Sequence, residues 1–332
     1  MQDDLLVLGV VVVTYGGGDV SLTCLETLLG SQNVVLRVAV VDNGSPDDTV
    51  ALLRNWAAGA QAAPLDLPFA AVPVAKPVPL DGSGAGHQVT LIETGKNTGF
   101  AGGVNVGLAH LAQDDAIDRF WVLNPDCAVP PETARVLAVA PDGFALLGGR
   151  IIYQDDPDMI QSDGGKIRWA TGVTQSVHQF ADPGTTSAIE PDTLDFISGA
   201  SMVASRAFYE SVGPMREDYF LYYEEVDWAQ RRNAPLAYAG DAVVYHKGGA
   251  SIGSRTTRQK ASPLSLYFIH RARIRFLWRF RKTGLPGGIA FSLAKAAQLL
   301  LAGDVAGAES LLRGTFQMHA PQGVRARVAG GV

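Results

Sequence analysis

The sequence predicts an α/β fold in which helices flank a mostly parallel β-sheet. Residues 6–14 and 34–42 are apolar runs rich in β-branched side chains, which is typical of strands buried on both faces. Between them, residues 21–31 carry leucines at the spacing of one helix face. A strand, a helix and a second strand in this order indicate a parallel pair joined by a crossover helix.

A second helix and a long insertion follow this unit. The helix is expected over 46–58, with Ser45 as its N-cap and two aspartates in its first turn, where they favour the helix dipole. Residues 57–88 contain five prolines and show no hydrophobic period. We therefore expect 57–88 to be an insertion at the surface.

The alternation of strands and helices then resumes. Residues 148–189 combine glycine, aspartate and threonine with short alternating stretches, which indicates hairpins and loops over the open face of the sheet. The remaining expected elements are strands at 89–93, 119–123 and 242–245, a helix at 103–113 and a helix that starts near 131.

The C-terminal part differs from the rest of the chain in charge. The 332-residue chain has a formal net charge of −6, yet residues 255–332 hold 13 of its 27 basic residues and only 2 of its 33 acidic residues. Residues 263–281 and 284–316 have helical patterns. We therefore expect a domain over 1–260 and a helical, basic extension over 261–332, and the two parts face different partners.

Cysteine content and apolar runs limit the class of protein. Cys24 and Cys127 are too few for a disulfide framework and lack metal-binding spacing, so we expect a reducing compartment. The first apolar run follows two aspartates and is too short to cross a bilayer, which argues against a signal peptide or an N-terminal anchor. Residues 288–303 contain a lysine and a glutamine, which predicts an amphipathic helix. A cytoplasmic location is expected.

Polar clusters follow several of the apolar runs. In an open α/β sheet ligands bind at the strand ends, so polar residues gathered there indicate a site. A glycine turn at 198–200 and an aromatic run at 219–223 are expected to form walls of the same cleft. The clusters are Asp42-Asn43-Gly44-Ser45, the glycine-rich segment 97–105, Asn124-Pro125-Asp126, Glu224-Glu225-Val226-Asp227, and His246.

Each of the first three clusters fits part of a nucleotide ligand or a plain structural role. Asp42 suits a nucleobase N–H or a ribose hydroxyl, or it caps a turn. The glycines of 97–105 let the backbone approach a diphosphate before a helix N-terminus, or they form a flexible capped loop. Asp126 suits Mg²⁺ or Mn²⁺ that bridges a diphosphate, although Asn-Pro-Asp is also ordinary turn chemistry.

The acidic cluster and the histidine suit proton transfer and metal binding. If a helix starts at Glu224, then Glu224 and Asp227 share one face while Glu225 points elsewhere. One carboxylate can then act as general base in a cleft while the others cap the helix or pair with nearby arginines. Acidic residues are also ordinary at helix starts. His246 fits a metal or phosphate ligand or a buried structural histidine.

Taken together, the clusters resemble family 2 glycosyltransferases of the GT-A fold, and in particular their rhamnosyltransferase-like branch. The resemblance covers about residues 7–260 and depends on the order of the motifs. They run Val-Val-Thr-Tyr at 12–15, Val-Asp-Asn-Gly-Ser at 41–45, Asn-Thr-Gly-Phe-Ala-Gly-Gly-Val-Asn at 97–105, Leu-Asn-Pro-Asp at 123–126, Ser-Gly-Ala at 198–200, Phe-Leu-Tyr-Tyr-Glu-Glu-Val-Asp at 220–227, and His246.

The resemblance implies a role for each matching residue. It implies that Glu225, with Glu224 beside it, is the catalytic base, and that Asp126 and His246 bind Mg²⁺ or Mn²⁺. Asn124 stands where the family has the first acid of Asp-x-Asp, and the pair Glu224-Glu225 stands where the family often has Glu-Asp. The implied contacts to the donor come from Thr14, Tyr15, Asp42, Asn97, Gly99, Gly103, Asn105 and Asn124.

The implied reaction is an inverting transfer of a sugar in cell-surface polysaccharide synthesis, with rhamnose favoured by the branch. The donor is a dTDP- or UDP-linked sugar, and the acceptor is a hydroxyl of a glycan or a polyprenyl-linked glycan. A sugar-phosphate nucleotidyltransferase is the nearest competing enzyme, but the loop 14–19 has no lysine or arginine for a triphosphate. A catalytically silent nucleotide-sugar-binding protein is a further alternative, because of Asn124.

Residues 271–282 interleave basic and aromatic or aliphatic side chains. Such a stretch suits the anionic inner face of the plasma membrane, where lipid-linked acceptors are found, and a solvated helix has the same composition. The acidic body of the chain argues against nucleic acid as a partner. We expect a cytoplasmic protein that binds the membrane periphery through 271–282.

Overall fold

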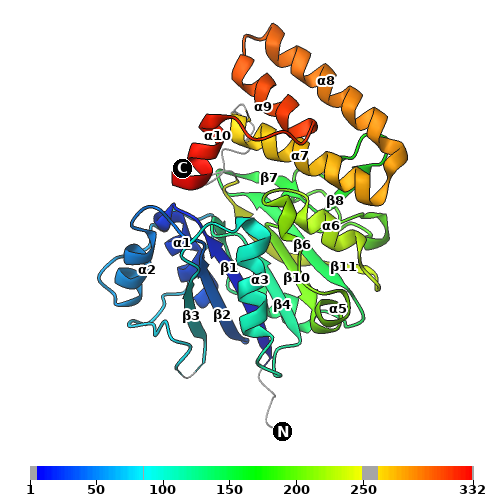
Figure 1. Ribbon diagram of the computed structural model, residues 1–332. Coiled ribbons are helices and arrows are strands. Elements are labelled where there is room, and N and C mark those ends of the chain that lie inside the picture. The colour runs from blue at the N-terminus through cyan, green and yellow to red at the C-terminus, as the bar shows by residue number, and fades with distance from the viewer. Residues whose placement is uncertain (1–5, 85, 249–260, 331–332) are drawn as a thin grey trace.

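A mixed nine-stranded sheet forms the centre of this computed structural model, which describes residues 6–84, 86–248 and 261–330. The strand order is β3-β2-β1-β4-β10-β6-β11-β5, and β7 pairs with β6 outside this path. Figure 1 shows the sheet covered by helices, with the last four helices gathered above it. A separate hairpin of β8 (Gly165–Arg168) and β9 (Val173–Ser176) lies outside the sheet.

The first half of the sheet is parallel, as the sequence predicts. Each crossover in this half contains a helix or passes through the insertion, so each strand starts from the same edge. The strands are β1 (Val7–Thr14), β2 (Val35–Asp42), β3 (Gln88–Glu93) and β4 (Arg119–Leu123), and the helices are α1 (Gly18–Leu29), α2 (Thr49–Ala57), α3 (Gly99–Leu111) and α4 (Thr133–Val139).

The second half of the sheet is mixed, which differs from the expectation of a mostly parallel sheet. The chain enters β10 at the edge where the parallel strands end, so β10 runs antiparallel to both β4 and β6. β6 and β11 are parallel, and β5 and β7 run antiparallel to their partners. The bounds are β5 (Cys127–Ala128), β6 (Leu146–Tyr153), β7 (Asp156–Ser162), β10 (Ser201–Ser205), β11 (Leu236–His246), α5 (Arg206–Val212) and α6 (Glu224–Gln230).

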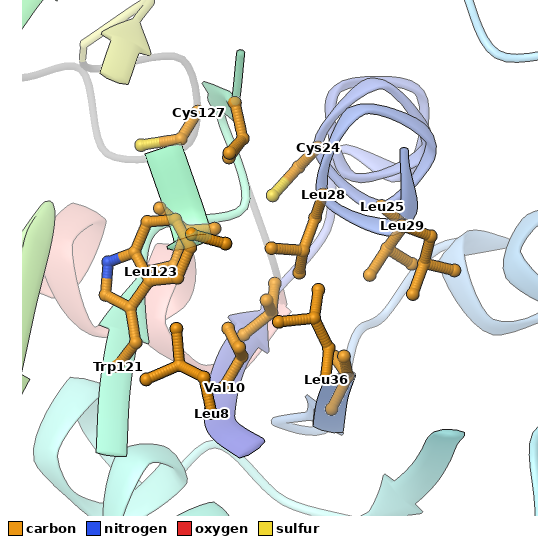
Figure 2. Close-up of a cluster of buried hydrophobic side chains, with 14 of the residues drawn as sticks. Leu8, Val10, Cys24, Leu25, Leu28, Leu29, Leu36, Trp121, Leu123 and Cys127 are labelled. Atoms are coloured by element: carbon orange, nitrogen blue, oxygen red, sulfur yellow. The ribbon is translucent and has the colours of Figure 1, made fainter. Parts of the chain in front are cut away.

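Both faces of the sheet are buried, and this explains the continuous apolar strands. One face packs against α1, α2 and α4, and the other packs against α3, α5, α6 and α7. Figure 2 shows leucines of α1 against Leu8, Val10 and Leu36 of the strands. Cys24 and Cys127 lie in this core as free thiols, and burial raises the pKa of each, so neither is a reactive nucleophile.

The start of α2 differs from the sequence expectation. The helix begins at Thr49, and its first N–H groups are served by Asp47 instead of Ser45. The Ser45 hydroxyl accepts the N–H of Gly16, so it ties the loop after β1 to the loop after β2. Between the end of α2 at Ala57 and the start of β3 at Gln88 the described residues form no helix or strand, and several of their aliphatic side chains pack on the core.

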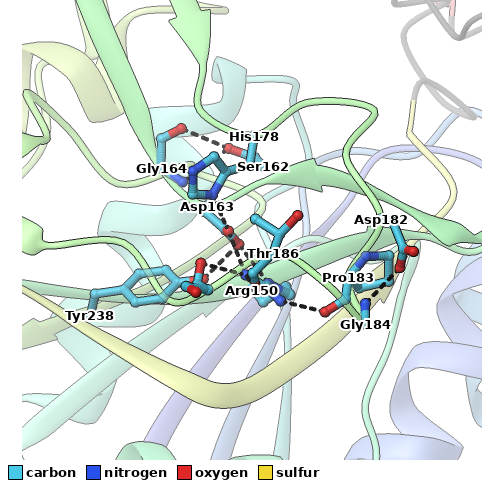
Figure 3. Close-up of polar contacts among 11 residues, drawn as sticks. Arg150, Ser162, Asp163, Gly164, His178, Asp182, Pro183, Gly184, Thr186 and Tyr238 are labelled. Atoms are coloured by element: carbon cyan, nitrogen blue, oxygen red, sulfur yellow. Dashed lines mark hydrogen bonds and ion pairs between the residues drawn. The ribbon is translucent and has the colours of Figure 1, made fainter.

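A buried ionic cluster holds the loops that follow β7 against the sheet. The carboxylate of Asp163 accepts two hydrogen bonds from the Arg150 guanidinium, at 2.9 and 3.1 Å, and one from Tyr238 Oη at 2.6 Å. His178 Nδ1 lies 2.8 Å from the same carboxylate (Figure 3). Arg150 also donates to the carbonyls of Pro183, Thr186 and Ser187, so one guanidinium fixes a loop that has no regular structure.

The C-terminal extension is helical, as the sequence predicts. α7 packs against the sheet domain through Ala272 and Phe276, and the hairpin of α8 and α9 packs on α7. α10 returns to the sheet domain, where the carbonyl of Val328 accepts a hydrogen bond from Tyr15 at 2.9 Å. The bounds are α7 (Pro263–Phe280), α8 (Leu285–Leu301), α9 (Val305–Thr315) and α10 (Gln322–Gly330).

Candidate functional site

A cavity of about 300 Å³ lies where β1, β4 and β11 end. Eight separate stretches of the chain line it, including the turn 198–200 and the aromatic segment 220–222, which the sequence predicts as walls. Eight of the twelve site residues that the resemblance implies lie in this lining. Those in the lining are Tyr15, Asn97, Gly99, Asn124, Asp126, Glu224, Glu225 and His246.

The pairing of β5 with β11 brings Asp126 and His246 together from 120 residues apart. His246 is the last residue of β11 and lies opposite Cys127, the residue after Asp126. The backbone carbonyl of Asp126 also accepts the N–H of Lys247. As a result, His246 Nε2 lies 3.0 Å from Asp126 Oδ1, and both side chains are largely buried at the cavity wall.

The hydrogen bonds of His246 leave its Nε2 facing the cavity as an acceptor. Nδ1 lies 2.6 Å from the amide oxygen of Gln161, which only accepts, so Nδ1 carries the proton. In the neutral ring Nε2 then has a lone pair, and Asn124 Nδ2 lies 3.3 Å from it. The nearby Asp126 oxygen is also an acceptor, and two electron-rich atoms this close together suit a shared cation.

The residues present therefore fit a divalent metal ion with two protein ligands. No group of three or more histidine, cysteine or acidic side chains forms a metal cage in the described residues. Mg²⁺ and Mn²⁺ sites in nucleotide enzymes commonly take one or two protein ligands, with phosphate and water completing the coordination. Asn124, which replaces an acid, is directed at the His246 ring and orients it.

Glu224 and Glu225 enter the cavity because the chain before α6 is sharply turned. Phe220, Tyr222 and Tyr223 all have positive φ angles, between 68° and 71°, so the helix begins at the cavity wall. Gly199 faces Glu225 closely, since a Cβ on Gly199 would lie 3.5 Å from the Glu225 Cβ. The aromatic segment thus sets the position of the two carboxyl groups.

Burial makes these two carboxyl groups weak acids. Burial raises the pKa of Glu225 to about 7, and burial together with Glu225 raises the pKa of Glu224 well above its usual range. Glu224 Oε1 has no hydrogen-bond partner within the described part of the chain. Burial thus favours the protonated form of Glu224, while Glu225 exchanges a proton near pH 7, as a general base requires.

Asp227 does not line the cavity, whereas Glu224 and Glu225 both do, which corrects the expectation that Glu224 and Asp227 share one face while Glu225 points elsewhere. Its carboxylate is fully buried and accepts hydrogen bonds from Tyr219 Oη and Arg231 Nε, each at 2.8 Å. This pairing with Arg231 is one of the two roles that the sequence leaves open. Asp227 therefore anchors α6 to the segment before it.

Asn43 holds the glycine-rich loop and lines the cavity, whereas its neighbour Asp42 does not. Asn43 Oδ1 accepts from the N–H and the hydroxyl of Thr98, and its amide donates to the Gly99 carbonyl at 2.9 Å. The Asp42 carboxylate accepts from Thr14 and from the Ser45 N–H. Thr14 and Asp42 are buried behind the cavity wall, so the structure assigns them to its support.

Gly103 and Asn105 also lie outside the cavity lining, which corrects their expected place in the donor pocket. α3 begins at Gly99, so both residues lie inside the helix. Gly103 lies against Val13, where a Cβ would clash with the valine side chain. Asn105 donates to the Met215 carbonyl and accepts the Met215 N–H, which ties α3 to the segment before α6.

Gln161 and Leu264 are a supporting residue and a cavity residue that the motifs did not identify. Gln161 lies on β7 in a region without a recognisable motif, and only the folded hairpin brings it to His246. Leu264, at the start of α7, lines this cavity and also a larger hollow of about 800 Å³ between α7, α9 and α10. The larger hollow lacks a carboxylate–imidazole pair, so the chemistry belongs to the smaller cavity.

Comparisons with known proteins identify the family of the chain. Residues 9–208 match the model of glycosyl transferase family 2. An N-acetylglucosaminyl-diphospho-decaprenol L-rhamnosyltransferase of Mycobacterium tuberculosis is 27% identical over 82% of this chain and 84% of its own. A low-salt glycan biosynthesis hexosyltransferase of Haloferax volcanii is 26% identical over 43% of this chain and 46% of its own, so the match spans about half of that relative.

The fold is shared with solved glycosyltransferase structures. A mannosyltransferase of Pyrobaculum calidifontis, solved with GDP-Man and Mn²⁺, has a TM-score of 0.51 at 14% identity, over 94% of this chain and 80% of that one. At this identity the likeness concerns the fold alone. Together with the family match over more than half of the chain, it confirms the predicted GT-A architecture. The chain belongs to glycosyl transferase family 2, a family of glycosyltransferases.

Proposed function

We propose that the chain transfers a sugar from a nucleoside diphosphate donor to a hydroxyl group by a single inverting displacement. The observation that carries this proposal is the convergence of Glu225 with Asp126 and His246 on one cavity. The pair suits a cation beside a diphosphate, and Glu225 has a pKa of about 7. An acid–base group with a pKa near the working pH is the most effective one for moving a proton.

The donor diphosphate binds at the Asp126 end of the cavity. Asp126 and His246 would hold Mg²⁺ or Mn²⁺, which when bound supplies positive charge to the departing diphosphate. The N-terminus of α3 at Gly99 adds the positive end of a helix dipole to the same cavity. Tyr15 and Asn97 line the part left for the nucleoside. We propose a dTDP- or UDP-linked sugar, with rhamnose supported by the mycobacterial relative's name.

The acceptor binds on the other side of Glu225. A polar cavity of about 450 Å³ shares only Glu225 and Ser198 with the donor cavity. Its lining carries hydroxyl and amide side chains, which suit the hydroxyl groups of a carbohydrate. These side chains belong to Ser162, Thr174, Gln175, Ser176 and Gln179. We propose a glycan or lipid-linked glycan as acceptor, used in cell-surface polysaccharide synthesis at the cytoplasmic face of the membrane.

Because Glu225 lies between the two cavities, it can act as the base in a single displacement at the anomeric carbon. Glu225 removes the proton from the acceptor hydroxyl, and the acceptor oxygen forms a bond to the anomeric carbon. The bond from that carbon to the diphosphate oxygen breaks, and the diphosphate leaves with the electron pair. Because the attack and the departure occur on opposite sides of the carbon, the anomeric configuration inverts without a covalent enzyme intermediate.

A catalytically silent nucleotide-sugar-binding protein is the second candidate. The specific observation in its favour is Asn124, which contacts His246 where the resemblance implies an acid, so that Asp126 and His246 are the two ligands that the described residues offer. Such a protein would bind the donor and leave it unchanged. The experiment below separates the two candidates.

The test measures donor binding and sugar transfer in wild type, Glu225→Gln and Glu210→Gln. A panel of nucleotide sugars is first screened by thermal shift with Mn²⁺, since a ligand that binds the folded state raises its melting temperature. We expect wild type and Glu210→Gln, an exposed surface variant, to transfer the sugar at similar rates. Glu225→Gln should bind the donor normally but lose about 100-fold or more in kcat. Donor binding without transfer by wild type, across acceptors, would support the silent protein instead.

A further inference from the structure

Helix α8 presents an apolar surface that nothing in the described chain covers. Only Gly288, Ser292 and Ala296 of its 17 residues are buried. Leu301 is 90% exposed, Leu300 51% and Leu293 47%. Soluble proteins rarely expose a continuous apolar surface of this kind unless it binds something. Figure 1 shows α8 on the outer side of the C-terminal helices, away from the sheet.

The buried residues of α8 form one narrow line of small side chains against α7. Gly288 lies so close to Leu277 that a Cβ would clash with it, and Ser292 accepts a hydrogen bond from the buried Arg273. His270 Nδ1 lies 2.9 Å from the Ser292 hydroxyl. These contacts fix which side of α8 faces outward, and they leave Leu293, Leu300 and Leu301 on that side.

The sequence predicts that the basic stretch 271–282 binds the membrane, but several of its arginines are used in contacts within the protein. Arg273 is buried, and Arg275 and Arg279 both pair with Asp218 of the sheet domain. Arg275 and Arg279 thus attach α7 to the domain, and Asp218 compensates part of their charge. Arg281 and Lys282 remain exposed at the junction of α7 and α8.

An aromatic side chain accompanies the two exposed basic residues. Trp278 is 61% exposed, and the Lys282 ammonium lies 4.9 Å from the centre of its ring. Tryptophan next to basic residues is typical of the interface between lipid head groups and acyl chains. Residues 282–303 contain no acidic residue, and Lys295 adds a third positive charge along the helix.

We propose that the outer face of α8, with Trp278, Arg281 and Lys282 at its start, lies flat on an anionic lipid bilayer. The leucines enter the acyl boundary while the basic side chains contact anionic head groups. The segment Lys282–Leu301 is long and apolar enough to cross a membrane by length and composition. Spanning would, however, pull Ser292 away from Arg273 and leave that buried guanidinium without this contact, so the interfacial arrangement is favoured.

The position of α7 relates this surface to the catalytic cavity. Leu264 at the start of α7 lines the cavity, and α7 leads from there to Trp278 and α8. A helix of 18 residues is about 27 Å long. If the proposed lipid-linked acceptor is correct, this brings the cavity within reach of a head group, but α8 binding to a bilayer does not depend on that acceptor.

The test is flotation of the full chain with lipid vesicles in the absence of any substrate. Vesicles of phosphatidylcholine alone are compared with vesicles that also contain phosphatidylglycerol. We expect salt-sensitive binding to the anionic vesicles, with partitioning lowered about tenfold by Leu300→Gln/Leu301→Gln. Arg281→Gln/Lys282→Gln should lower binding to the anionic vesicles by a similar factor and have little effect on neutral ones.

Matched variants separate this surface from general effects of charge and polarity. Leu65→Gln/Val139→Gln removes two other exposed apolar side chains, and Arg54→Gln/Arg135→Gln removes two other basic ones; both should float like wild type. Circular dichroism and thermal unfolding confirm that each variant is folded. Equal flotation of all variants, or none with wild type, would overturn the proposal.

A second copy of the chain is the alternative occupant, and light scattering detects it. A dimer that Leu300→Gln/Leu301→Gln converts to a monomer, without vesicle binding by wild type, would assign the face to self-association and reject the bilayer. Because this assay uses no donor or acceptor, failure of the proposed transfer reaction leaves its outcome unaffected.

Discussion

The amide oxygen of Gln161 lies 2.6 Å from Nδ1 of His246, on the side of the ring opposite Asp126. This contact decides which ring nitrogen carries the proton and therefore directs the lone pair of Nε2 toward Asp126. Partners of this kind commonly tune metal affinity as strongly as some direct ligands do. Gln161 is thus a positioning residue for the cation site.

Replacing Gln161 should weaken metal binding more than it weakens folding. We expect Gln161→Leu to lower Mn²⁺ affinity by about 10-fold to 100-fold, because His246 loses the acceptor that fixes its tautomer. Titration of Mn²⁺ by electron paramagnetic resonance measures this without any turnover. Gln113→Leu, on the exposed end after α3, is the control and should bind Mn²⁺ like wild type. Equal affinities in the two variants would contradict the role of Gln161.

Transfer should depend on pH through Glu225. Burial raises the pKa of this carboxyl to about 7, so the fraction able to accept a proton falls as the pH drops below 7. We expect kcat/KM to rise about tenfold per pH unit below that value and to level off above it. A pH series on wild type and Glu225→Gln tests this, since the residual activity of the variant should lack the acidic limb.

The same burial predicts an effect of pH on stability with a definite sign. The folded-state pKa of Glu225 exceeds that of the unfolded chain, so the folded protein binds more protons between about pH 4.5 and 7. The free energy of unfolding should therefore decrease as the pH rises through this window. Urea unfolding of Glu225→Gln should show a smaller decrease over the same range than wild type shows.

Gly99 has two separate reasons to be glycine. Its φ is +79°, and a Cβ would collide with the carbonyl oxygen of Phe220. Gly95 has a φ of +70° with no other atom within 4 Å of the Cβ position, so it provides a matched control. We expect Gly95→Ala to cost about 1 kcal/mol of unfolding free energy from backbone strain, and Gly99→Ala to cost clearly more.

The position of Phe220 makes Gly99→Ala informative about the site as well. The Gly99 loop and the aromatic segment before α6 meet at this contact, where the Phe100 N–H also donates to the Phe220 carbonyl. Displacing the segment should weaken donor binding, measured by calorimetry. If Gly95→Ala and Gly99→Ala reduce stability and donor affinity equally, the contact with Phe220 has no separate importance.

Replacing the buried Asp163 should strongly lower the free energy of unfolding. Asp163→Asn removes the charge that Arg150 faces in a buried environment, so we expect a loss of about 3 to 5 kcal/mol in unfolding free energy. Asp142→Asn is the control, because its carboxylate is 93% exposed while it pairs with Arg119. That variant should lose less than about 1 kcal/mol in a urea titration. A similar loss in both would show that burial of the Arg150 pair has little consequence.

The sequence predicts much of the parallel half of the sheet and the order of the motifs. Runs buried on both faces contain few polar residues, so β1, β2 and β4 are visible as continuous apolar segments. Polar residues directly after them are visible as clusters for the same reason. Asp126, Glu225 and His246 could therefore be named as one site before their contacts were known.

The second half of the sheet could not be predicted in the same way. The direction of β10 depends on where the preceding loops return to the sheet, which is a long-range property. Neighbouring residues within a motif also separate, because successive side chains of a strand or loop point to different sides: Asn43 reaches the cavity, while Asp42 supports its wall.

The sequence by itself determined the α/β character of the chain, its motif order and the basic, helical nature of its C-terminal part, because these depend on local periodicity and composition. Only the tertiary structure decided which of these side chains line the site or the surface and which are used in packing contacts. It placed Gln161 behind His246, turned Gly103 and Asn105 toward packing contacts, and paired the arginines of α7 with Asp218 while leaving the leucines of α8 exposed. Whether a side chain can contact a ligand depends on what packs against it, and those packing partners lie tens to hundreds of positions away in the chain.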